Sequence, residues 1–185
     1  MADDALAAVK SVRLVAVLLL MTGIGVLVSR EPVTEIVISK SARSLVAYGA
    51  GGRVLMRVPI GPGRAPEGHK QREGDQRTPE GEYYVCFRNT QSRYRLSLGL
   101  SYPNPEDAAH GLAEGAIGEE EHAAIVEAHR RRGIPPWKTA LGGEIFIHGS
   151  LDERDATAGC VALRDRDIDE LFPNVALGTP VRIVP

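Results

Sequence analysis

The residue with the clearest chemical potential is Cys160, which follows Thr157, Ala158 and Gly159 in a short polar stretch. A thiol becomes an effective nucleophile when an imidazole takes its proton, because the thiolate is the reactive form. His148 ends an apolar run and Cys160 begins the next one, so each would lie where a strand meets a loop. A histidine or cysteine alone is most often structural, but this combination predicts a cysteine enzyme with His148 as the base.

The second cysteine, Cys86, lies in an apolar, β-prone run and is expected to act as a small buried hydrophobe. The alternative is a Cys86–Cys160 disulfide, because oxidising compartments favour pairing. The histidines show no metal-binding spacing, so neither a metal site nor a cofactor is predicted. The formal net charge of -2, spread over interspersed acids and bases, gives no indication of nucleic-acid binding.

The elements that must position these two residues are mainly strands. Short β-prone runs alternate with glycine- and proline-containing turns, and no internal repeat is evident. We expect a mainly β domain, either a β-sandwich or a curled mixed sheet, and not a doubly wound parallel sheet. The predicted strands are residues 35–39, 44–48, 53–60, 81–88, 96–101, 144–148, 160–163 and 180–184.

Two short helices are predicted. Residues 119–132 have acids at the start and arginines at the end, which suits the helix dipole, and their thin apolar stripe indicates a surface helix. Residues 165–172 form the second helix, with Asp165 as its N-cap.

A long stretch without strand character, residues 61–79, separates two of the predicted strands. Loops of this length are often functional. Its basic residues Lys70, Arg72 and Arg77 could bind an anionic substrate, although a solvated loop is the ordinary interpretation.

The N-terminal segment is a separate unit. Residues 14–28 are apolar apart from Thr22 and two glycines, and Lys10 and Arg13 precede them. We expect residues 1–32 to form a transmembrane signal anchor, with a cleaved signal peptide or a buried core helix as alternatives. The two cations favour a cytoplasmic N-terminus, so the domain at residues 33–185 would lie outside the cytoplasmic membrane, periplasmic or secreted.

The residues around Cys160 also resemble the L,D-transpeptidase catalytic domain of the YkuD type. Its hallmark is His-Gly followed after a loop by Ser/Thr-x-Gly-Cys, which is matched here by His148-Gly149 and residues 157–160. Residues 78–83 look like the Thr-Pro-x-Gly-x-aromatic strand entry of the family, and residues 39–45 resemble its opening hairpin. The resemblance spans residues 33–184 and implies a YkuD-like fold and a role in peptidoglycan biosynthesis and cell shape.

The resemblance also implies roles for individual residues. Cys160 would attack the carbonyl after an L-centre in a peptidoglycan stem tetrapeptide, which releases the terminal D-alanine and leaves a thioester. The Gly149 carbonyl would orient His148, and the Gly159 and Cys160 N–H groups would face the developing oxyanion. The Thr157 hydroxyl would fix the loop, although a plain turn is an equal alternative.

The chain departs from the family pattern at two positions. Many members carry histidine and arginine where this chain has Ala158 and Ala162, so the usual anchor for a substrate carboxylate or a loop is missing. Arg164 is the candidate replacement, and Tyr102 is a further candidate substrate contact. The Gly-Cys-x-Ala pattern resembles a subgroup that includes hydrolases of peptidoglycan-linked peptides. Transfer and hydrolysis therefore stay open, and a non-catalytic wall-binding module is the alternative from another class.

Overall fold

The computed structural model describes residues 31–151 and 156–185. All eight predicted strands form, with ends within a few residues of those expected. The described residues also form three α-helices and two short 3-10 turns. The elements in chain order are β1 Glu35–Ser39, β2 Ser44–Tyr48, η1 Ala50–Gly52, β3 Val54–Pro59, β4 Gly81–Ser92, β5 Arg95–Leu100, α1 Pro105–Ala113, α2 Glu119–Arg130, β6 Phe146–His148, β7 Val161–Ala162, α3 Asp165–Leu171, η2 Phe172–Asn174 and β8 Pro180–Val184.

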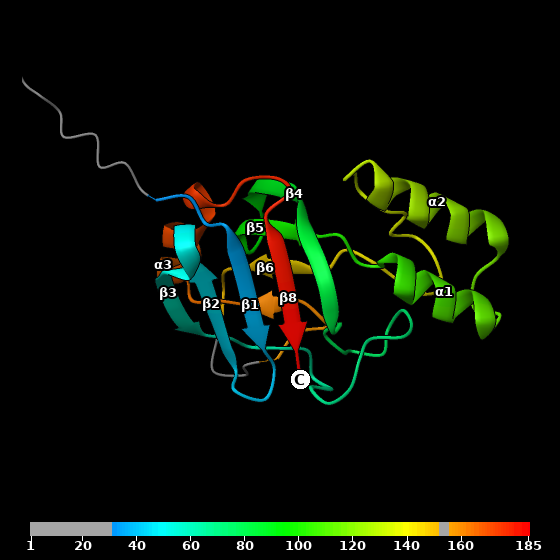
Figure 1. Cartoon of the computed structure of the whole chain (residues 1–185). Helices are drawn as coiled ribbons and strands as arrows, with labels where there is room; N and C mark the ends of the chain where they lie inside the picture. The colour runs from blue at the N-terminus through cyan, green and yellow to red at the C-terminus, as the bar shows by residue number, and fades with distance from the viewer. Residues whose placement is uncertain (1–30, 152–155) are drawn as a thin grey trace, which may run out of the picture.

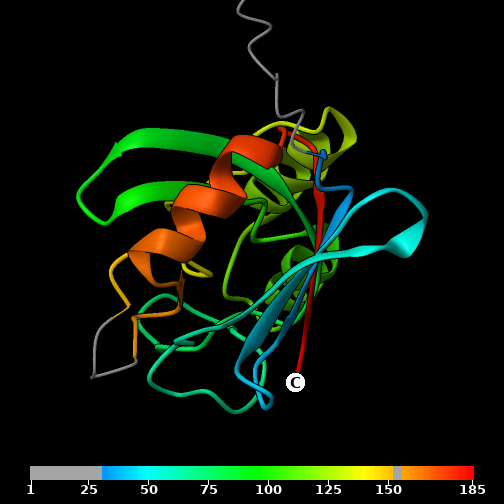
Figure 2. The same ribbon diagram turned by 90° about the vertical axis from the view of Figure 1, so that its left-hand side faces the viewer.

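The strands make one mixed sheet in the order β3-β2-β1-β8-β4-β5-β6-β7. The pairs β1–β8 and β6–β7 are parallel, and the other pairs are antiparallel. Strand β4 belongs to both halves of the sheet, because its first residues pair with β8 and its later residues pair with β5. The sheet turns at β4, as Figures 1 and 2 show, and this confirms the predicted curled mixed sheet.

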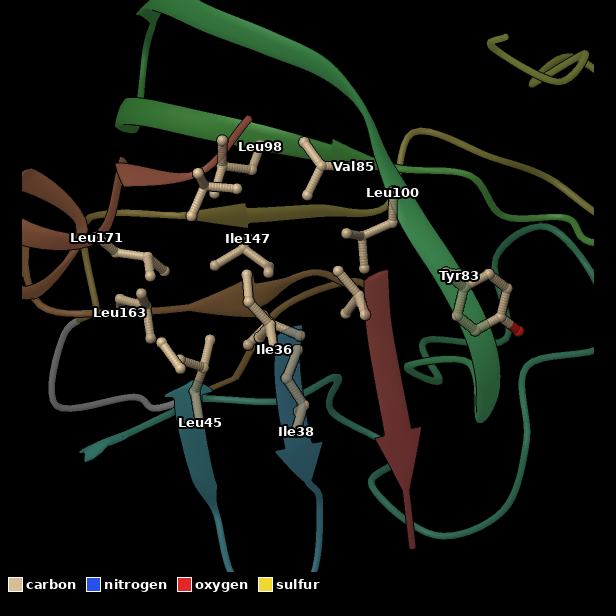
Figure 3. Close-up of a cluster of buried hydrophobic side chains, with 14 of the residues drawn as sticks. Ile36, Ile38, Leu45, Tyr83, Val85, Leu98, Leu100, Ile147, Leu163 and Leu171 are labelled. Atoms are coloured by element: carbon tan, nitrogen blue, oxygen red, sulfur yellow. The ribbon is translucent and has the colours of Figure 1, made fainter. Parts of the chain in front are cut away.

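The core lies inside the curl. Strand β1 alternates strictly between buried and partly exposed residues, so Ile36 and Ile38 point inward on one face. They lie opposite Ile147 of β6, and all three side chains are fully buried (Figure 3). Ile168 and Leu171 of α3 join the same cluster. The residues beside Cys160 and His148 therefore belong to the rigid part of the fold.

Helix α1 was not predicted, so the expectation of one or two helices was incomplete. Asn104 caps it by accepting hydrogen bonds from the N–H groups of Glu106 and Asp107, and the Asp107 carboxylate accepts from the Asn104 N–H. Pro105 occupies the first helical position, where its missing N–H costs nothing. Helices α1 and α2 project from one side of the sheet (Figure 1) and share a small apolar cluster, Ala108, Ile117, Ile125 and Leu141.

Helix α3 has Arg164 at the N-cap, so Asp165 is its first helical residue and the predicted N-cap role of Asp165 was wrong. The Asp165 carboxylate instead accepts a hydrogen bond from the Ser150 N–H at 2.8 Å, which ties the helix to the loop after His148.

The predicted N-terminal anchor, residues 1–32, lies outside the described residues except for its last two. Among the helices of the described ranges, none has the length and apolar character needed to cross a bilayer.

Candidate active site

Cys160 and His148 line the same cavity, which has a volume of about 720 Å³. Its wall combines four segments that are distant in the sequence: part of the loop at residues 61–79, the tip of the β4–β5 hairpin, residues 143–146 and the turn before β7. The structure therefore brings together the two residues that the sequence paired.

The register of two short parallel strands explains their proximity. Ile147 pairs with Val161, and His148 pairs with Ala162. The Ile147 and Val161 side chains are fully buried in the core, so His148 and Cys160 project from the opposite face. Cys160 lies two residues before Ala162, which makes it a diagonal neighbour of His148 on that face.

His148 is held as a neutral base. Its Nδ1 lies 2.6 Å from the Gly149 carbonyl oxygen, and since a carbonyl only accepts, Nδ1 carries the proton. The lone pair is then on Nε2, which has no hydrogen-bond partner in the described ranges. Burial lowers the pKa of His148 below its ordinary value of 6.5, the Gly149 contact opposes this, and the charge of Arg93 adds to it.

An aromatic ring covers His148. Tyr94, at the tip of the β4–β5 hairpin, stacks on the imidazole with ring centroids 4.6 Å apart and planes 23° apart. The Tyr94 carbonyl also accepts a hydrogen bond from the Gly149 N–H at 3.0 Å. The hairpin tip therefore fixes both the plane of the imidazole and the backbone that orients it.

Cys160 is half-buried. Its Sγ accepts from the Phe146 N–H at 3.4 Å and donates to the Glu144 carbonyl at 3.6 Å. Burial raises the pKa of the Cys160 thiol above its ordinary value of 9.0, although the Phe146 N–H and the charge of Lys70 oppose this. The thiol is therefore neutral near pH 7, and its proton is directed at the Glu144 carbonyl and not at His148.

The turn before Cys160 is pinned by Thr157, as expected. Its hydroxyl accepts from the Gly159 N–H at 3.0 Å and donates to the Cys160 carbonyl at 2.6 Å. The Gly159 N–H, expected to face an oxyanion, is thus already paired with the Thr157 hydroxyl. The Cys160 N–H is used by no described residue, which leaves it available to donate to a ligand.

Both glycines of the motif are required by their surroundings. Gly159 has φ of 135°, and a Cβ there would lie 2.8 Å from the Arg77 carbonyl oxygen. A Cβ at Gly149 would lie 2.7 Å from an Asp165 carboxylate oxygen and 2.9 Å from the Tyr94 carbonyl. Each position therefore excludes a side chain. The absence of a Cβ lets the backbone at Gly159 approach Arg77, and the backbone at Gly149 approach Asp165 and Tyr94.

Two predicted substrate contacts lie away from the cavity. Arg164 is exposed at the start of α3 and does not line it. Tyr102 is fully buried, and its hydroxyl donates to the Leu141 carbonyl at 3.0 Å, so it cannot contact a ligand there. The two cysteines are free, which excludes the disulfide alternative, and burial raises the pKa of the Cys86 thiol to about 12.

Several residues of the cavity wall were not predicted from the sequence, and the position of Lys70 was predicted only as an alternative. Arg64 and Tyr94 line the cavity, and so does Lys70, for which a solvated position was the ordinary interpretation. The loop reaches the cavity because Gly61 pairs with Ala162 and Gly63 pairs with Thr157 beyond the end of β3. The signal in the sequence for Tyr94 was a single aromatic residue at the tip of a hairpin.

Comparison with known proteins agrees with this geometry. The model of the YkuD family, the L,D-transpeptidase catalytic domain, matches residues 33–183. The protein named Putative L,D-transpeptidase YafK from Escherichia coli (strain K12) is 30% identical over 108 residues. That match covers 57% of this chain and 30% of the relative, so the chain corresponds to under a third of its length.

Two solved structures share the fold. The helical cell shape determining protein Pgp2 (K307A mutant) from Campylobacter jejuni superposes with a TM-score of 0.58 and 22% identity, covering 83% of this chain and 47% of that chain. Bd1075 from Bdellovibrio bacteriovorus superposes with a TM-score of 0.53 and 23% identity, covering 83% and 48%. The chain thus spans about half the length of each.

Proposed function

Because the chain belongs to the family of the L,D-transpeptidase catalytic domain, we propose that it is a cysteine acyl-transfer enzyme acting on peptidoglycan stem peptides. The observation that supports this most strongly is the cavity shared by Cys160 and His148, with the free Nε2 lone pair on the base. A buried neutral imidazole beside a neutral thiol is suited to taking a proton when substrate arrives.

In the first step, His148 Nε2 takes the thiol proton and the Cys160 sulfur attacks the peptide carbonyl. The carbonyl oxygen becomes an oxyanion, and the Cys160 N–H is the donor available to stabilise it. The tetrahedral intermediate then breaks its C–N bond, and the imidazolium returns the proton to the leaving amine. A thioester on Cys160 and a released terminal residue are the products.

In the second step, an acceptor attacks the thioester carbonyl while His148 removes its proton. The C–S bond then breaks, and the Cys160 sulfur takes a proton back from the imidazolium. An amine from a second peptide gives transpeptidation, and water gives carboxypeptidase or amidase-type hydrolysis. The same cavity wall serves both steps, because the acceptor enters where the leaving group departed. The base and the nucleophile have the same roles in the two reactions, so the acceptor alone distinguishes them.

The proposal includes a location. We propose that residues 1–32 anchor the chain in the cytoplasmic membrane, or direct its secretion if they are cleaved, with the catalytic domain in the periplasm. The apolar run at residues 14–28 and the cations Lys10 and Arg13 support this. Peptidoglycan is reached only from that side of the membrane.

The test is a digest of isolated cell wall after incubation with the purified chain. New cross-linked muropeptides indicate transfer, and trimmed or freed peptides indicate hydrolysis. Cys160→Ala must abolish either product, whereas Cys86→Ala, the matched buried-thiol control, must not. Wall that is bound but chemically unchanged would overturn the enzyme assignment and indicate a binding module.

A further inference from the structure

The cavity contains a buried cation that the proposed reaction has not yet used. Lys70 is only 2% exposed, yet it lines the same cavity as Cys160. Its Nζ donates to the Arg72 carbonyl at 2.8 Å and to the Asp75 carboxylate at 3.0 Å. An ammonium has three donors, and the third has no hydrogen-bond acceptor among the described residues.

The Lys70 ammonium is not the only group that compensates the negative charge of Asp75. Asp75 also accepts hydrogen bonds from the backbone N–H groups of Gln71, Arg72 and Arg77, at 2.8 to 3.1 Å. Burial would raise the pKa of Asp75, but these N–H groups and Lys70 outweigh it and hold the pKa below its ordinary value. Because the backbone shares in compensating Asp75, positive charge on Lys70 remains available to a ligand.

The chain around Lys70 is fixed on both sides. His69 is linked to the Asp107 carboxylate at 2.8 Å, and its Nδ1 accepts from the Glu80 N–H at 2.9 Å. Lys40 donates to the Gly68 carbonyl at 2.5 Å. Since a preorganised cation loses little conformational entropy on binding, it is better suited to recognition than a mobile surface lysine.

Two further observations concern the position of the Lys70 ammonium relative to Cys160 and to the cavity wall. The Lys70 ammonium is one of the charges that act on the Cys160 thiol, where it favours the thiolate. Behind Lys70 lies the ring of the buried Tyr102, with its centroid 5.8 Å from Nζ. The other cations of the wall, Arg64 and Arg93, are exposed, so solvent screens them more strongly.

We propose that Lys70 binds the free terminal carboxylate of the donor peptide, one residue beyond the carbonyl that Cys160 attacks. This assignment rests on the proposed function and deepens it, because it makes the site selective for donor peptides that end in a free carboxylate. A peptide whose last residue carries a neutral carboxamide would lose this contact.

The experiment compares two synthetic donors, a stem tetrapeptide with a free C-terminal acid and the same peptide with a C-terminal amide. A hydrogen bond to a charged group changes kcat/KM by roughly 10- to 100-fold, so we expect the 185-residue chain to prefer the acid by that factor. Lys70→Met should remove the preference by slowing turnover of the acid alone. Lys138→Met, which removes an exposed lysine outside the cavity, is the matched control and should keep the preference.

Lys70→Gln keeps a donor for Asp75 but lacks the charge, and it provides a second variant if Lys70→Met does not fold. Equal turnover of acid and amide by the unmutated chain would overturn the role of Lys70 while leaving the proposed function standing. An equal loss on both donors in the variants would also overturn it, because a purely structural lysine has that effect. Turnover of neither donor by the unmutated chain would overturn the proposed function itself.

Discussion

Replacing Tyr94 with alanine tests whether the hairpin tip holds the catalytic base. The substitution removes the ring that stacks on His148 at 4.6 Å, but it keeps the Tyr94 carbonyl that accepts from the Gly149 N–H. An aromatic pair of this kind contributes about 0.5–1.5 kcal/mol. If that energy holds the imidazole in its reactive orientation, its loss lowers kcat/KM about two- to tenfold.

The substitution also has a predicted sign in pH dependence. Burial is the main reason that the pKa of His148 lies below 6.5, so uncovering the ring moves that pKa upward. The base works only when neutral, and the acid limb of kcat/KM therefore shifts to higher pH. The deficit of Tyr94→Ala should be larger below pH 6.5 than at pH 8.

The assay is kcat/KM against pH, with an NMR titration of the His148 imidazole in the same variants. Tyr94→Phe keeps the stacked ring and is the matched control, so it should follow the unmutated profile. An acid limb that stays in place or moves to lower pH in Tyr94→Ala would refute the reasoning. A phenylalanine variant as impaired as the alanine variant would also refute it.

Three further substitutions have defined outcomes. Gly159→Ala places a Cβ 2.8 Å from the Arg77 carbonyl at a φ of 135°, so kcat should fall about 100-fold or more; unchanged single-turnover rates would contradict this. Cys86→Ala removes a buried thiol whose pKa is raised to about 12, so steady-state activity should stay within about twofold. Lys40→Met leaves the Glu80 carboxylate and two carbonyls without their cation, and urea unfolding should show a loss of about 1.5–3 kcal/mol.

The strands, and the meeting of His148 and Cys160 in one cavity, could be predicted because both depend on local patterns. Strand β1 is visible as the β-branched run Ile36-Val37-Ile38 between polar residues, and His148 and Cys160 are marked by adjoining glycines. Helix α1 had a readable cap in Asn104 and Pro105, but its apolar residues are few and pack on Leu141, far along the chain. Its stability depends on tertiary contacts that no local window contains.

The other residues that line the cavity were less predictable. Tyr102 was expected at the cavity, but the fold buries it behind Lys70. Lys70 has the appearance of a solvated basic loop residue, because its contacts with Asp75 and with the ring of Tyr102, 32 residues along the chain, form only in the folded structure. Which side chain of a long loop reaches a cavity depends on how the loop is anchored, and the bridge between Gly63 and Thr157 provides that anchor here.

The central claim is that Cys160 forms a thioester after His148 has taken its proton. Intact-mass spectrometry of the chain mixed with a stem tetrapeptide, followed by peptide mapping, measures this directly. We expect an adduct with the mass of the donor minus its terminal residue, located on Cys160 and absent in Cys160→Ala and His148→Ala. An adduct on Cys86, or full turnover by Cys160→Ala without any adduct, would contradict the claim.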